Sequence, residues 1–197
     1  WVDFDLDWRH VYDFHQKQLQ HLQSGHMLDR WVLKTGAHLF GLERMLEAYP
    51  DARVVFLHRD PAAATPSTAG LVECLDMLLT PSRDRAAIGA RVLALLQRMH
   101  SAASAARDAW PASAPPYLDV AYDTLVADPL ATVRTILAHF DMPEPPETSD
   151  AVRRHLRTSR RTRLPSLRYA CATYGFSEES ARAALPPFPG AGDRHHP

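Results

Sequence analysis

Apolar residues recur along this chain in two patterns, one typical of amphipathic helices and one typical of buried strands. Apolar residues three and four positions apart indicate helices. They occur over 9–23, 38–49, 66–79, 88–99 and 128–140. Short apolar runs between turn residues indicate strands, and they occur at 31–34, 54–57 and 117–122.

The order of these elements predicts an α/β fold with a mostly parallel central sheet, because helices alternate with strands. In the first helix we expect Val11, Phe14, Leu19 and Leu22 to form the buried face. The run Val54-Val55-Phe56-Leu57 suits a strand that is covered on both faces.

The size and composition fit one globular domain, with 197 residues of which 46% are hydrophobic. We expect that domain to span 1–185 and the Pro/Gly-rich tail 186–197 to be loose. The chain begins at Trp1 rather than at methionine, which raises the expectation of an N-terminally incomplete sequence.

Charge and cysteine content exclude several classes of protein. The net charge of -1 argues against a globally basic nucleic-acid binder, and two cysteines are too few for a disulfide scaffold. No apolar run reaches the roughly 20 residues of a membrane span, and no signal peptide is present, so we expect a cytoplasmic protein. The eleven histidines form no metal-binding motif, and we expect no metal.

Arg59 and Ser67 form the first candidate site. Arg59 follows the predicted strand 54–57, and Ser67 lies where we expect the next helix to begin. Ligands of open α/β sheets bind beyond the carboxyl ends of the strands, and a helix N-terminus favours phosphate. Alternatively, Arg59 pairs with Asp60 or with a neighbouring helix, and Ser67 only caps its own helix.

Lys34 and His38 form the second candidate site, after the predicted strand 31–34. A lysine can stabilise developing negative charge, and a histidine can act as a general base near neutral pH. The alternative is a solvated lysine and a structural histidine at a helix start.

A third feature is an arginine-rich run, Arg153 to Arg163, followed by Arg168. It contains no acidic residue, so it could bind phosphates or an acidic polymer. The alternative is a solvated helix face.

Taken in order, these motifs resemble the bacterial sulfotransferases that use 3'-phosphoadenosine 5'-phosphosulfate (PAPS). The resemblance rests on the following segments: Trp31-Val32-Leu33-Lys34, Pro50-Asp51-Ala52-Arg53, His58-Arg59-Asp60-Pro61 with Pro66-Ser67, Tyr122-Asp123-Thr124-Leu125 with Asp128-Pro129, and more loosely Arg168-Tyr169 with Tyr174-Gly175-Phe176.

The resemblance implies a three-layer α/β fold of the P-loop kinase type and transfer of a sulfuryl group to a hydroxyl or amine. It places Arg59 and Ser67 at the 3'-phosphate of the donor and Tyr122 near the nucleotide. It places Lys34 at the transferred group and, more loosely, His38 as the base. Gly36 stands where this family usually has a proline.

The family's 5'-phosphosulfate loop should precede Lys34, and 1–30 contain no such Gly/Arg/Thr-rich turn. The resemblance therefore implies that the first strand and its loop are missing, and that this stretch alone folds poorly or is inactive. A non-catalytic remnant that uses the arginine-rich run is the alternative function. A P-loop kinase is disfavoured because no Walker motif is present. The acceptor and the oligomeric state are not specified by the sequence.

Overall fold

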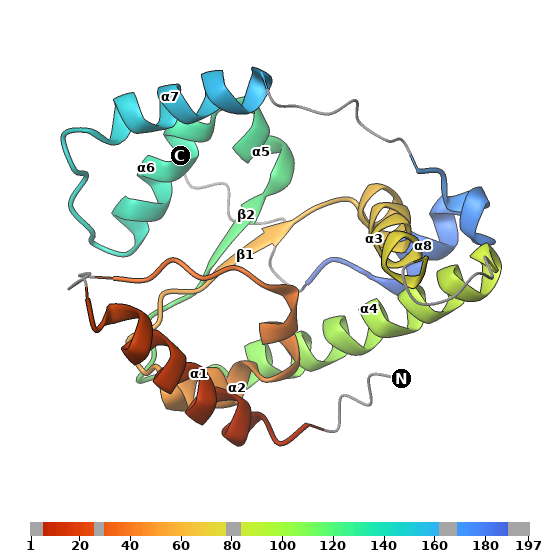
Figure 1. Cartoon of the computed structure of the whole chain (residues 1–197), viewed down its shortest axis with the longest axis horizontal. Coiled ribbons are helices and arrows are strands. Elements are labelled where there is room, and N and C mark those ends of the chain that lie inside the picture. Colours follow the sequence, from red (N-terminus) through yellow and green to blue (C-terminus); the bar gives the residue numbers. More distant parts are fainter. Residues whose placement is uncertain (1–5, 26–29, 78–83, 162–168, 189–197) are drawn as a thin grey trace. The chain divides into compact units, whose positions relative to one another are not determined.

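The computed structural model describes residues 6–25, 30–77, 84–161 and 169–188. Figure 1 shows its helices and strands. In chain order they are α1 (Trp8–Gln23), the 3-10 helix η1 (Gly36–Phe40), α2 (Leu42–Ala48), β1 (Val55–His58), α3 (Pro61–Asp76), α4 (Arg85–Asp108), β2 (Leu118–Ala121), α5 (Tyr122–Ala127), α6 (Pro129–His139), α7 (Thr148–Arg161), the 3-10 helix η2 (Cys171–Tyr174) and α8 (Glu178–Ala184).

The chain forms two compact units. The first comprises 1–52 and 96–115, and the second comprises 53–95 and 116–197. The helix α4 contributes its first part to the second unit and its last part to the first. The expectation of one domain over 1–185 stays a prediction.

In the first unit, α1 packs on α2, and the two helices lie side by side in Figure 1. Gly41 separates η1 from α2 where we expected one continuous helix. A Cβ atom at Gly41 would come within 2.4 Å of the Trp8 ring, so only glycine allows this approach of α1.

The predicted buried face of α1 is wrong. Phe14 and Leu22 are 62% and 59% exposed, whereas Tyr12 is the buried residue of the helix. Tyr12, His15 and Gln16 contact η1 and the end of α2 through hydrogen bonds. The inward face of α1 is therefore polar and aromatic, because its neighbours supply partners for those polar groups.

The predicted strand 31–34 is also wrong. These residues have no regular secondary structure, and Val32 is 91% exposed. A strand exists only where its backbone groups pair with a neighbour. Within the described parts of the chain, the sheet consists of β1 and β2 alone.

In the second unit, β1 and β2 form a parallel pair, with Val55 opposite Leu118 and His58 opposite Ala121. This confirms the α/β class with a parallel sheet. Burial on both faces of β1 is not observed: Phe56 is buried, whereas Val55 and Leu57 are 37% and 51% exposed. Exposed and buried side chains thus alternate along β1, and the face that carries Phe56 is the packed one.

The helix α3 begins at Pro61 rather than near Pro66, with the Asp60 side chain capping the Ala62 N–H. Pro66 lies inside the helix, where it has no N–H to donate to the Ala62 carbonyl. The Cys171 thiol donates to that carbonyl instead, at 3.4 Å. The side chain of Cys171, the first residue of η2, thereby supplies the hydrogen bond that Pro66 cannot give to the Ala62 carbonyl.

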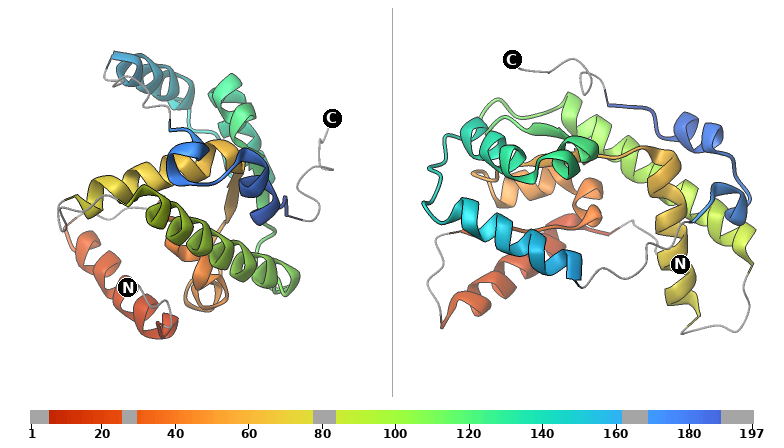
Figure 2. Two further views of the ribbon diagram at one scale, coloured as in Figure 1. Left: turned by 90° about the vertical axis from the view of Figure 1, so that its right-hand side faces the viewer. Right: turned by 90° about the horizontal axis from the view of Figure 1, so that it is seen from above.

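A buried polar cluster joins α3, α4 and η2. Glu73 is 7% exposed; its Oε2 accepts from the Tyr174 hydroxyl at 2.8 Å, and its Oε1 accepts from Arg85 Nε at 2.9 Å. Gly89 lies directly under Tyr174, and α3 runs alongside the 171–184 segment in both views of Figure 2.

Asp128 caps α6 and Pro129 is its first residue, as the sequence predicts. In the described part of the tail, Phe188 packs against Phe56 and His58 with ring centroids 6.1 and 5.7 Å apart, and the expectation of a loose tail stays a prediction. Residues 189–197 lie outside the described part. No helix in that part is long and apolar enough to cross a membrane.

Candidate functional site

Two predicted donor-binding residues meet in the second unit. Arg59 follows β1 directly and Tyr122 follows β2, so both stand at the carboxyl edge of the parallel pair. The Arg59 guanidinium carbon lies 4.9 Å from the centre of the Tyr122 ring, a cation–π contact. Arg59 is exposed, so its N–H groups remain available to an anionic ligand.

The alternative that Arg59 pairs with Asp60 is wrong. Both oxygens of Asp60 accept from Arg182, at 3.0 and 2.9 Å. This hydrogen-bonded pair with Arg182 and the cap to Ala62 hold the pKa of Asp60 below its usual value. Asp60 is therefore neutralised by a different arginine, and no acidic residue within the described ranges pairs with Arg59.

Ser67 lies within α3, six positions after its first residue, and does not cap the helix. It is half-buried, and no described residue bonds its hydroxyl. The expected combination of Ser67 with a helix N-terminus is therefore wrong, because the free N–H groups of α3 belong to its start at Pro61. Ser67 can contribute its own hydroxyl only.

Lys34 is exposed in the first unit, and no described acidic residue pairs with it. The following Thr35 caps η1, where its hydroxyl accepts from Ala37 N at 3.2 Å. The cap places His38 on the single turn that begins two residues after Lys34. Lys34 thus precedes the capped turn, and His38 lies within it.

His38 is half-buried in a cluster with Tyr12, His15 and Tyr49. Its Nδ1 is 2.9 Å from the Tyr12 hydroxyl, and the two rings stack with centroids 5.9 Å apart. His15 meets His38 edge-on at 6.0 Å, and its own Nδ1 is 2.7 Å from the Tyr49 hydroxyl.

This surrounding changes the acidity of the cluster. Burial lowers the pKa of the His38 imidazole, and the nearby His15 lowers it further. Burial raises the pKa of the Tyr12 hydroxyl well above its usual range, and it also raises the pKa of Tyr49. His38 is therefore neutral, and able to accept a proton, down to a lower pH than an exposed histidine.

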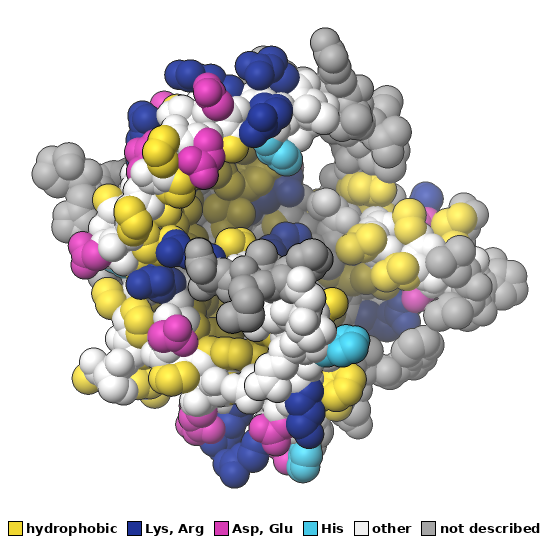
Figure 3. Space-filling view, turned by 60° about the vertical axis from the view of Figure 1, so that its left-hand side comes forward, with side chains coloured by type: hydrophobic (Ala, Val, Ile, Leu, Met, Phe, Trp, Pro, Cys, Tyr) yellow, Lys and Arg dark blue, Asp and Glu magenta, His cyan; other side chains and the backbone are white. Residues whose placement is uncertain are grey.

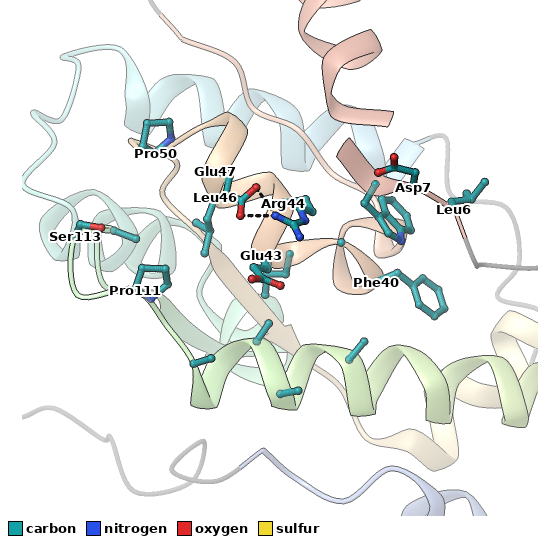
Figure 4. A pocket seen from close by; sticks show the side chains of 18 residues that line it. Leu6, Asp7, Phe40, Glu43, Arg44, Leu46, Glu47, Pro50, Pro111 and Ser113 are labelled. Carbon is teal, nitrogen blue, oxygen red and sulfur yellow. Dashed lines mark hydrogen bonds and ion pairs between the residues drawn. The ribbon is translucent and has the colours of Figure 1, made fainter. Parts of the chain in front are cut away.

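A cavity of about 870 Å³ lies elsewhere in the first unit (Figure 4). Trp8 and Phe40 stack on one side of it, alanines of α4 form another side, and the ion pair between Arg44 and Glu47 lies at its edge. Neither Lys34 nor His38 lines this cavity. We therefore do not assign it to the reaction.

The arginine-rich run lies mainly on α7. Its residues Arg153, Arg154 and Arg157 are exposed, and Figure 3 shows basic side chains gathered along the upper edge, where α7 lies. Arg163 and Arg168 lie outside the described residues. No group of three or more His, Cys, Asp or Glu within the described ranges could hold a metal ion.

The sequence interpretation missed Tyr12, which contacts the candidate base. Tyr12, His15, Gln16 and Leu19 recur at helical spacing and mark the inward face of α1. This aromatic and polar stripe is the sequence signal for Tyr12, and a search for apolar residues alone does not detect it.

Comparison with known proteins agrees with this fold. The family model described as "Sulfotransferase family" matches residues 3–146. No curated protein sequence matches the chain.

Two crystal structures of mycobacterial sulfotransferases are similar to the chain. They are STF9 from Mycobacterium avium, with a TM-score of 0.80, 25% identity and coverage of 91% of this chain, and STF1 from Mycobacterium tuberculosis, with a TM-score of 0.75, 29% identity and coverage of 92%. The matched part is 46% of each of those chains, so this chain spans under half their length. The chain belongs to the sulfotransferase family.

Proposed function

We propose that this protein transfers a sulfuryl group from PAPS to an acceptor hydroxyl or amine in the cytoplasm. The contact between Arg59 and Tyr122 carries the proposal, because it combines an exposed guanidinium with an aromatic face at the carboxyl edge of the sheet. A nucleotide with an additional phosphate on its ribose needs both groups: a cation for the phosphate and a surface for the base or sugar.

In this proposal Arg59 and Ser67 bind the 3'-phosphate, and Tyr122 lies against the nucleotide. The residues fit this ligand, since no described acidic residue pairs with Arg59 and no described residue bonds the Ser67 hydroxyl. Arg59, which follows β1, and Ser67, which lies in α3, would each contribute one side chain to the 3'-phosphate.

Lys34 and His38 perform the chemistry in this proposal. His38 takes the proton of the acceptor, and Lys34 stabilises the negative charge on the bridging oxygen of the leaving bisphosphate. Sulfuryl transfer, like phosphoryl transfer, depends on positioning and charge stabilisation, and this step uses no metal.

Binding of adenosine 3',5'-bisphosphate tests the proposal. Arg59→Ala should weaken bisphosphate binding roughly tenfold or more and leave 5'-AMP binding unchanged, since it removes a charge-assisted hydrogen bond to the 3'-phosphate. Arg154→Ala on α7 is the matched control and should change neither. Calorimetric titration gives both affinities, and equal losses for the two nucleotides would contradict the proposal.

The second candidate function is a non-catalytic module that binds an acidic partner through α7. The exposed residues Arg153, Arg154 and Arg157 favour it. In that case Arg154→Ala weakens binding to heparin, used as a probe, and no PAPS turnover is measured with any acceptor.

A further inference from the structure

The stacked pair of Tyr12 and His38 has a geometry that goes beyond simple packing. The Tyr12 hydroxyl approaches the Nδ1 atom of His38 at 2.9 Å, while the two rings lie nearly parallel, 17° apart. Tyr12 is 2% exposed, so its ring is held on all sides by α1 and its neighbours. A hydrogen bond and a ring contact together fix the orientation of the imidazole.

We infer that Tyr12 is a positioning residue that engages Nδ1 of His38 and leaves Nε2 as the nitrogen that accepts the proton of the acceptor substrate. Within the described residues, no polar atom bonds Nε2. The inference rests on the proposed role of His38 as the base.

During transfer of the sulfuryl group, the O–H or N–H bond of the acceptor breaks, and its proton goes to Nε2 of His38. The freed electron pair forms the bond to sulfur, and the S–O bond to the bisphosphate breaks with its electron pair on the leaving oxygen. His38 keeps its original proton on Nδ1 throughout, and this N–H donates a hydrogen bond to the Tyr12 oxygen.

A tyrosine suits this position because it stays uncharged. Burial keeps the Tyr12 hydroxyl protonated, so it offers His38 a dipole and not a full negative charge. A carboxylate behind the imidazole would raise the pKa of His38, whereas here burial and His15 lower it. The result is a base that is neutral over most of the physiological pH range.

The other groups that face His38 are His15 from α1 and, behind it, Tyr49 at the end of α2. The Tyr49 hydroxyl is hydrogen-bonded to Nδ1 of His15 at 2.7 Å, and among the described residues it makes no hydrogen bond with His38. Tyr49→Phe therefore removes a similar hydroxyl from the same cluster and keeps the Tyr49 ring, which meets the Tyr12 ring edge-on at a centroid distance of 6.3 Å. It is the matched control for Tyr12→Phe.

Nitrogen-15 NMR of the histidine side chains tests the inference directly in the wild-type protein. We expect neutral His38 to carry its proton on Nδ1. In Tyr12→Phe the share protonated on Nε2 should rise, and the pKa of His38 should fall, because the imidazolium loses its hydrogen-bond acceptor. Tyr49→Phe should change the His15 signals and leave the His38 tautomer as in wild type.

Turnover of PAPS with water as the acceptor gives the second readout. Tyr12→Phe should reduce turnover about tenfold and move the pH at which the rate rises to a lower value. Tyr49→Phe should leave the turnover and its pH profile within about twofold of wild type.

Three results would overturn the inference. Neutral wild-type His38 with its proton on Nε2 would show that Tyr12 donates and blocks the reactive form. A Tyr12→Phe protein with wild-type tautomer and pH profile, in which His38→Ala still abolishes turnover, would refute the positioning role alone. Unchanged turnover in His38→Ala would refute the proposed base and the inference together.

Discussion

The guanidinium of Arg59 lies 4.9 Å above the ring of Tyr122, although the two residues follow different strands. The parallel register makes this contact possible, because His58 stands opposite Ala121 and the next residue of each strand continues at the same edge. The hydrogen bonds between β1 and β2 thereby fix the backbone from which Arg59 and Tyr122 extend.

Tyr122→Leu should weaken binding of adenosine 3',5'-bisphosphate about threefold, because Arg59 loses a cation–π contact that is worth roughly 0.5–1 kcal/mol at an exposed site. Tyr122→Phe keeps the aromatic face and should bind as the wild type does. Calorimetry on the two variants measures the difference. Equal affinity of both variants would show that the ring does not hold Arg59.

The rate of PAPS turnover should rise with pH through a midpoint below the usual imidazole value of about 6.5, because burial and His15 lower the pKa of His38. The base is active when neutral, so a lower pKa moves the rise toward acid and leaves a plateau at neutral pH. Lys34→Ala should reduce the plateau and keep the midpoint.

His38→Ala should reduce the plateau by about 10²–10⁴-fold and remove the rise itself. The two variants therefore separate a proton acceptor from an electrostatic group in one pH series. A rise that persists in His38→Ala would assign it to another group.

Tyr174→Phe should lower the free energy of unfolding by about 1–3 kcal/mol, since Glu73 loses one of its hydrogen-bond donors in a buried place. Tyr169→Phe, whose hydroxyl has no partner among the described residues, is the control and should cost less than about 0.5 kcal/mol. Denaturant unfolding of both proteins gives the comparison.

The same hydroxyl predicts a loss of stability at alkaline pH. Burial and the bond to Glu73 raise the pKa of Tyr174 to about 12 from 10.0. Between these values the unfolded chain binds fewer protons than the folded chain, so the stability falls as the pH rises. Tyr174→Phe should lack this part of the alkaline loss.

Gly89→Ala should destabilise the second unit by about 3 kcal/mol. A Cβ atom at Gly89 would lie 2.0 Å from the Tyr174 carbonyl oxygen, and a backbone atom cannot move away as a side-chain tip can. Gly25→Ala meets nothing within 4 Å and is the control. Thermal unfolding followed by circular dichroism measures both, and equal melting temperatures would contradict the close contact.

Gly36→Pro should stabilise the protein by about 0.4–1 kcal/mol, because it restricts the unfolded chain. Gly36 is the first residue of η1, where proline is tolerated, and Thr35 before it is already extended. A Cβ at this position would lie 3.0 Å from the Met99 methyl group, the flexible end of a side chain that can shift. A lower stability in denaturant unfolding would show that the turn needs the freedom of glycine.

The sequence predicts local signals well and long-range partners poorly. The pair Asp128-Pro129 correctly marks the start of α6, and Asp60-Pro61 marks the start of α3 in the same way. The second start was misread because Pro66 looked like a helix beginning. Inside α3, Pro66 leaves the Ala62 carbonyl free, and the thiol that bonds this carbonyl belongs to Cys171, 109 residues from Ala62, which no local pattern shows.

In the candidate site, too, residues marked by a local motif could be predicted, whereas residues that depend on a distant partner could not. Arg59 and Lys34 could be found because each stands in a motif beside an apolar run. Tyr12 is marked locally only by the aromatic and polar stripe of α1, and no local pattern shows its contact with His38 across 26 residues. The strand predicted at 31–34 failed for a related reason: whether an extended segment becomes a strand depends on a partner elsewhere in the chain.

The pairing of β1 with β2 also sets the order in which this part of the chain can fold. The ladder closes a loop that contains both α3 and α4, and bringing such distant segments together costs chain entropy before any strand contact is gained. Helices α3 and α4 have local hydrogen bonds and can form first. The edge that carries Arg59 and Tyr122 therefore exists only once this long loop has closed, and its formation carries that entropic cost.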